Sequence, residues 1–168
     1  MFVAMVDHVR HVSDEAKASD SASAMVVRAH RGLLRGAREH MEAGRYQEAI
    51  LIAQAGAEAS SARASTALLA KYPVPLQEAL LGAFGADSNY NLSHTRPRKV
   101  WTFLTGDVIC DQKFWAEYKA HIERRNKAAH NTAPGLTKAN AEVSLIAATA
   151  FVDHIELVTG GVLGSNGW

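Results

Sequence analysis

Residues 46–72 read YQEAILIAQAGAEASSARASTALLAKY, a run of helix-forming residues that stops at Pro73. Small side chains recur along this run every three or four positions, at Ala49, Ala53, Gly56, Ser60 and Ala64. Residues at this spacing share one face of a helix, so the run predicts a long helix with a smooth face. Small residues let a neighbouring helix approach closely, and we therefore expect this helix at the centre of a bundle.

The sequence on either side has the same helical character. Alanine and leucine dominate, and alternating β-branched runs are nearly absent. Helices are predicted over residues 24–43, 46–72, a short stretch after 75, 100–104, 111–131 and 137–159, with a loop over 86–98. We predict an all-α fold, an up-and-down helical bundle of about five helices.

The ends of the predicted helices follow from capping residues. Asp111 and Thr137 are the expected N-caps of the last two helices, and Gly160 and Gly161 are expected to follow the final one. The resulting organisation is an N-terminal extension over residues 1–24, a helical bundle over 25–160 and a flexible tail over 161–168.

Composition narrows the class of protein. The 168 residues carry 18 Lys and Arg against 17 Asp and Glu, a formal net charge of +1, which argues against a protein that coats nucleic acid non-specifically. Cys110 is the single cysteine, so no disulfide can form within the chain. The apolar start is interrupted at Asp7, too early for a signal peptide or a membrane span. We expect a cytoplasmic protein with no membrane partner.

The helix predicted over 111–131 carries the chemistry. On a helical wheel, its packed stripe comprises Trp115, Tyr118, Ile122 and Ala129. Arg125 falls at the edge of this stripe, whereas Arg124 points away and is expected in solvent. A guanidinium beside a core is costly without a partner, which suggests that Arg125 has a function.

Two polar residues accompany Arg125 on this helix. Asn126 and His130 are four positions apart, so the amide is expected to hydrogen-bond the imidazole and fix its tautomer. Histidine titrates near neutral pH, and arginine binds phosphate through two parallel hydrogen bonds. Metal-free cleavage of RNA needs both groups.

The hexamer Arg125-Asn126-Lys127-Ala128-Ala129-His130 resembles the signature of the HEPN superfamily. The stretch from Tyr46 to Glu58 looks like the early helix of that family, and the resemblance extends over roughly residues 25–160. Arg35 and His40 have the same spacing as Arg125 and His130, but Gly36 follows that arginine and the surrounding motif helix is missing.

The resemblance implies a metal-independent endoribonuclease, such as the toxin or effector of a defence system. His130 would act as general base or acid, and Arg125 would bind the scissile phosphate. Asn126 would orient His130 or hydrogen-bond the backbone. Glu58 and His121 would be supporting residues. The family places its active site between two copies, so a homodimer with its interface along the stripe over 115–129 is expected, with RNA as substrate and an antitoxin as a further partner. No metal or cofactor is implied.

Other interpretations of the same residues stay open at this point. The family also contains catalytically silent members that bind nucleic acid, nucleotides or a partner. Arg125 could pair with Glu58 or another carboxylate only to hold two helices in register. His130 could interact with the carbonyl groups at the end of its helix and with the helix dipole.

Overall fold

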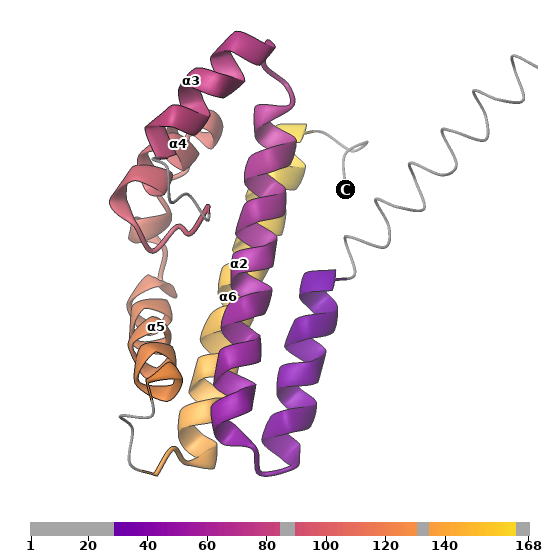
Figure 1. Ribbon diagram of the computed structural model, residues 1–168, viewed down its shortest axis with the longest axis vertical. Coiled ribbons are helices and arrows are strands. Elements are labelled where there is room, and N and C mark those ends of the chain that lie inside the picture. Colours follow the sequence, from indigo (N-terminus) through magenta and orange to yellow (C-terminus); the bar gives the residue numbers. More distant parts are fainter. Residues whose placement is uncertain (1–28, 85–89, 131–134, 164–168) are drawn as a thin grey trace, which may run out of the picture.

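A computed structural model of the chain describes residues 29–84, 90–130 and 135–163, and every regular element in these ranges is helical (Figure 1). A first helix covers residues 29–42 and is followed by α2 (Tyr46–Leu69), α3 (Val74–Phe84), α4 (Thr95–Thr105), the short 3-10 helix η1 (Ile109–Asp111), α5 (Trp115–Ala129) and α6 (Lys138–Leu163). The prediction of an all-α fold is therefore confirmed.

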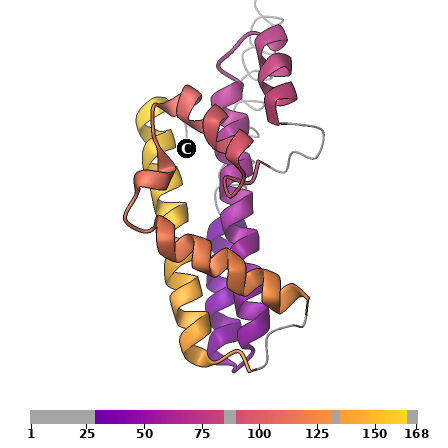
Figure 2. The ribbon, with the colours of Figure 1, turned by 90° about the vertical axis from the view of Figure 1, so that its left-hand side faces the viewer.

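The helices form a bundle with one helix laid across it. The first helix, α2 and α6 run lengthwise beside one another, and α3, α4 and α5 lie on one side of them (Figure 1). Figure 2 shows that α5 crosses α2 and α6 obliquely instead of running parallel to them. The bundle is as predicted, but the up-and-down arrangement does not extend to α5.

The smooth face of α2 is buried as predicted. Ala49, Ala53 and Ala64 are at most 2% exposed. A Cβ atom at Gly56 would lie 3.2 Å from the backbone oxygen of His30 and 3.3 Å from the side chain of Leu34. Glycine at this position thus lets the first helix approach α2 closely.

Several helix ends differ from the predictions. Asp111 lies in η1, and α5 begins only at Trp115, because the chain makes an extra turn before it. The segment predicted as a loop over 86–98 contains the start of α4, whose first turn accepts Pro97 since the first N–H groups of a helix have no intrahelical partner. Gly106, at φ 74°, ends α4 in the left-handed conformation.

The last helix begins as predicted and ends later. The backbone N–H of Asn140 donates to Thr137 Oγ1 at 3.3 Å, which confirms Thr137 as a capping residue. Both Gly160 and Gly161 lie inside α6, which continues to Leu163, so the expected tail starts later than residue 161. Residues 164–168 and the predicted extension over 1–24 lie outside the described residues.

The stretch Lys138–Gly160 of α6 is long and apolar enough to cross a membrane by length and composition alone. In the structure this helix packs against α2 and α5, and Phe151, Val152 and Ile155 on it are fully buried. A core helix of a bundle meets the same criteria, and one face of α6 is buried in this way, whereas Val143, Ile146 and Leu157 on the same stretch are exposed.

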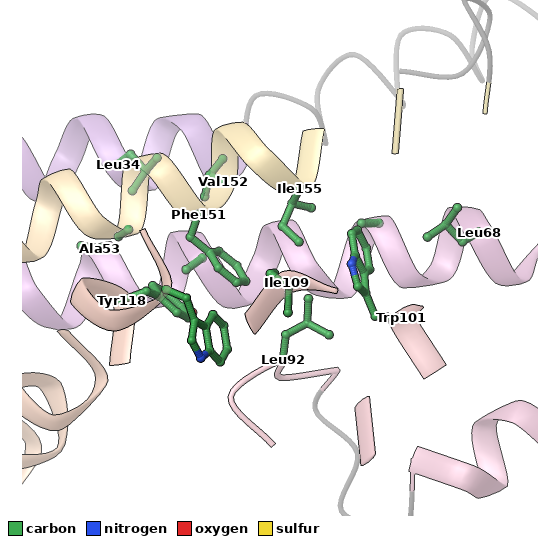
Figure 3. Packing of buried hydrophobic residues seen from close by; sticks show 14 of the residues in the cluster. Leu34, Ala53, Leu68, Leu92, Trp101, Ile109, Tyr118, Phe151, Val152 and Ile155 are labelled. Carbon is green, nitrogen blue, oxygen red and sulfur yellow. The ribbon is translucent and has the colours of Figure 1, made fainter. Parts of the chain in front are cut away.

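Aromatic side chains join the crossing helix to the bundle (Figure 3). The ring of Tyr118 from α5 stacks on that of Phe151 from α6, with centroids 4.0 Å apart and planes within 8°. Trp101 of α4 is 1% exposed, and Leu92 and Ile109 from the connecting segments are buried in the same core. The core thus holds α4 and α5 against α2 and α6.

One largely enclosed carboxylate, 12% exposed, connects three parts of the chain. Asp107 accepts hydrogen bonds from Trp101 Nε1 of α4 and His154 Nε2 of α6, each at 2.9 Å, and from Gln112 Nε2 at 3.0 Å. His154 is 13% exposed, and Asp107 is its partner.

Replacing Asp107 with alanine is expected to lower the free energy of unfolding by roughly 1–3 kcal/mol, because the buried indole N–H of Trp101 and the largely enclosed imidazole of His154 lose their acceptor. Urea denaturation monitored by circular dichroism measures this loss as a lower midpoint at unchanged slope.

Asp153→Ala is the matched control. Asp153 pairs with Arg31 at 2.7 Å but its side chain is 55% exposed, so the loss is expected to stay below about 1 kcal/mol. Equal effects of the two substitutions would contradict the role given to Asp107.

Candidate functional site

A polar cleft of roughly 430 Å³ lies between three parts of the chain: α2, the segment that directly precedes α4, and α5. It brings together three of the residues singled out from the sequence, Glu58 on α2 and the pair Arg125 and Asn126 on α5. Six further polar residues line it, Gln54, Asn91, Ser93, His94, Lys119 and Glu123. The cleft thus combines two carboxylates, three side-chain amides, a hydroxyl, two permanent cations and an imidazole.

Glu58 of α2 holds the segment that precedes α4 at the edge of the cleft. Its Oε1 accepts hydrogen bonds from Gln54 Nε2 at 2.9 Å and from Asn91 Nδ2 at 3.2 Å. Asn91 Oδ1 in turn accepts the backbone N–H of Ser93 at 2.9 Å. Glu58 is therefore not paired with Arg125. Its hydrogen-bond partners are the side-chain amides of Gln54 and Asn91, and through Asn91 it fastens the segment before α4 to α2.

Arg125 is half-buried at the cleft wall, as the wheel predicted. Its Nη1 donates to Asn126 Oδ1 at 3.2 Å. The amide oxygen that was expected to hold His130 therefore has a different partner. Asn126 steadies the guanidinium, and the guanidinium lies where a ligand in the cleft can reach it.

Arg124 is not in solvent, contrary to the prediction. It is half-buried, and its Nε donates at 2.8 Å to Oγ of Ser144, a fully buried residue of α6. The cause is the oblique crossing of α5, which turns a different face of the helix toward the bundle at each end.

The same crossing changes the packed stripe. The buried residues of α5 are Trp115, Tyr118, His121 and Ala128, whereas Ile122 is half-buried and Ala129 is exposed. The buried stripe packs into the core of the chain itself, so it does not offer an interface to a second copy. The face of α5 around Asn126 is exposed to solvent.

His121 lies in the core and not among the residues lining the cleft. It is fully buried, its ring centroid is 5.9 Å from that of Tyr118, and neither ring nitrogen has a hydrogen-bond partner among the described residues. Burial, followed by the positive charges of Arg124 and Arg125, lowers the pKa of His121 from 6.5 to about 4. A supporting role inside the cleft, expected from the sequence, does not fit this position.

His130 lies at the end of α5, beyond the residues that line the cleft. It is the C-cap of the helix, its backbone N–H donates to the Asn126 carbonyl oxygen at 3.1 Å, and its side chain is exposed. Lys119, Asn126 and His130 follow one another at spacings of seven and four, which places them on one helix face. His130 therefore lies one turn beyond Asn126 on this face, outside the cleft.

Sequence reasoning missed His94 and Lys119. His94 falls in the segment expected to be a loop. No local pattern connects it to the cleft residues of α5, the first of which, Lys119, follows 25 positions later in the chain. Lys119 carried a usable signal, because it shares the helix face of Asn126. The described ranges contain no group of three or more His, Cys, Asp or Glu side chains that could hold a metal ion.

No family model, curated protein or solved structure matches this chain. What the cleft binds or catalyses must therefore be inferred from the side chains that line it.

The buried His121 should make the protein sensitive to mild acid. Below pH 6.5 the unfolded chain takes up a proton at this imidazole, whereas the folded chain stays neutral until about pH 4. The free energy of unfolding should therefore fall as the pH drops through this window, by up to roughly 3 kcal/mol. In His121→Leu this part of the acid sensitivity should disappear, as measured by urea denaturation at pH 7.5 and 4.5.

His130→Gln is the control for this measurement, because it removes an exposed imidazole from the same helix. It should keep the acid sensitivity of the original protein. The account of His121 is wrong if His121→Leu loses as much stability between the two pH values as the unsubstituted chain does.

Proposed function

We propose that this protein is a metal-independent endoribonuclease of HEPN type. The observation that carries the proposal is the position of Arg125: it reaches a polar, open cleft together with Asn126 and Lys119, and an exposed histidine follows on the same helix face. These residues are the ones that the HEPN resemblance assigns to catalysis, with Lys119 added.

The proposed reaction is an attack of the RNA 2′-hydroxyl on the adjacent phosphorus. Arg125 binds the phosphate and stabilises the negative charge that builds up on its oxygens. His130 accepts the 2′-hydroxyl proton or donates a proton to the leaving 5′-oxygen. The products are a 2′,3′-cyclic phosphate and a 5′-hydroxyl end, and no metal ion takes part. Asn126 holds the guanidinium of Arg125 in place.

We also propose a homodimer, but its interface lies on a different face of α5 from the one expected from the sequence. Because the buried stripe of α5 is occupied by the core, a second copy would have to meet the exposed face that ends at His130. A two-fold axis at this end would bring the two copies of His130 near each other. By the same resemblance, we propose a cytoplasmic toxin or defence effector that is held in check by an antitoxin.

A catalytically silent module that binds nucleic acid or nucleotides is the second candidate. It is favoured by His130, which does not line the cleft and is not held by Asn126. In that case Arg125 and Lys119 would bind phosphate groups without turnover.

Arg125→Ala tests the proposal directly. In a buffer with EDTA, the protein is expected to cleave members of a panel of RNAs, and Arg125→Ala should lower kcat/KM by about 100-fold or more because the developing charge loses its main partner. His130→Ala should lower kcat by about 100-fold or more because a proton transfer is lost. Labelled RNAs resolved on denaturing gels give both rates.

Arg35→Ala is the matched control, since Arg35 is exposed on the first helix and precedes His40 by the same five positions. It should cleave RNA like the original protein, and all variants should keep its helical circular dichroism. If the original protein binds RNA without cleaving any, and Arg125→Ala only weakens that binding, the silent module is correct.

A further inference from the structure

His94 is an imidazole in the cleft that lies outside the Arg125–His130 segment. It precedes α4 directly, its side chain is exposed, and it lines the same cleft as Arg125. In Figure 2 the start of α4 and the whole of α5 lie on the same side of α2 and α6. Histidine and arginine, the two groups needed for phosphodiester cleavage, thus meet in one cleft of one chain.

The backbone that carries His94 is held firmly. Its N–H donates to the carbonyl oxygen of Asn91 at 3.0 Å, and Asn91 is fastened to Glu58 of α2. From the other side, Arg98 Nη1 donates to the carbonyl oxygen of Leu92 at 3.2 Å. Catalysis needs a reacting side chain on a fixed support, and this segment provides one.

His94 has no evident structural task at its position. It is the N-cap of α4, where Ser, Thr, Asp or Asn would stabilise the helix by about 1 kcal/mol, yet its side chain makes no capping hydrogen bond. An imidazole that neither caps the helix nor packs in the core is free to meet a ligand in the cleft.

The proposed reaction requires two proton transfers. One group must take the proton of the 2′-hydroxyl as the new oxygen–phosphorus bond forms, and another must protonate the 5′-oxygen as its bond to phosphorus breaks. His130 supplies one of these groups, and the HEPN resemblance would take the other from a second copy.

We propose that His94 is the second acid–base group and acts on a phosphodiester held by Arg125 in the same cleft. The proposal rests on the proposed endoribonuclease function. It makes His94 a catalytic residue and Glu58 and Asn91 its positioning residues. The charged groups that share the cleft with His94 are Glu58 from α2 and Lys119, Glu123 and Arg125 from α5.

The first test is His94→Gln in the full-length chain, assayed without metal. We expect kcat to fall by about 100-fold with KM changed less than about twofold, and the bell-shaped pH profile to lose one of its two limbs. Arg96→Gln, an exposed change on the same turn outside the cleft lining, should leave kcat and the profile unchanged. The melting temperature of each variant shows whether folding is intact.

A mixing experiment tests whether the two groups act in one chain. Chains with His94→Gln and chains with Arg125→Ala are unfolded together, refolded and assayed. Each chain then has an incomplete cleft, so activity should stay at the level of the separate variants. Recovery of activity would mean that His94 and Arg125 are contributed by different copies, and would overturn the proposal.

The remaining outcomes separate this proposal from the ribonuclease function itself. Full activity of His94→Gln beside an inactive His130→Ala overturns the role of His94 and leaves the endoribonuclease standing. No cleavage by the original protein overturns both. As a readout without turnover, the ring signals of His94 in NMR spectra should shift on addition of an uncleavable 2′-O-methyl RNA, and signals that stay unmoved overturn the contact with substrate.

Discussion

The close approach of helices to the smooth face of α2 is the constraint on which the rest of the structure depends. A side chain at Gly56 would meet the His30 carbonyl oxygen at 3.2 Å, and the alanines above and below it are equally enclosed. Burial of this face brings the first helix and α6 against α2 (Figure 1). The remaining helices must then cover what these three leave exposed, and α5 does so by crossing α2 and α6.

The cleft follows from the same arrangement. Glu58 lies two positions after Gly56, so it points about 200° away from the buried face. There it meets Asn91 of the segment before α4 and faces α5 across the cleft. One helix thereby supplies both the packing surface of the bundle and the polar anchor of the proposed site.

Much of the fold was predictable because helix ends and helix faces depend on neighbouring residues. Gly44 and Gly106 have positive φ values where the first helix and α4 were predicted to stop, and Thr137 caps α6 as predicted. Some helix ends were misplaced, at the starts of α4 and α5 and at the end of α6. The errors in the site lie where distant parts of the chain meet. Arg124 was assigned to solvent because a helical wheel assumes one straight buried stripe, whereas the crossing of α5 brings Arg124 to Ser144.

The sequence by itself determined the all-α class, the small-residue face of α2 and the exposure of Arg125 at the edge of a core, because periodicity and local propensity encode them. Only the tertiary structure decided that His121 is sealed in the core, that His130 lies beyond the cleft and that His94 lines it. Those positions depend on the crossing of α5 and on the contact between Glu58 and Asn91, 33 positions apart, which no local pattern records.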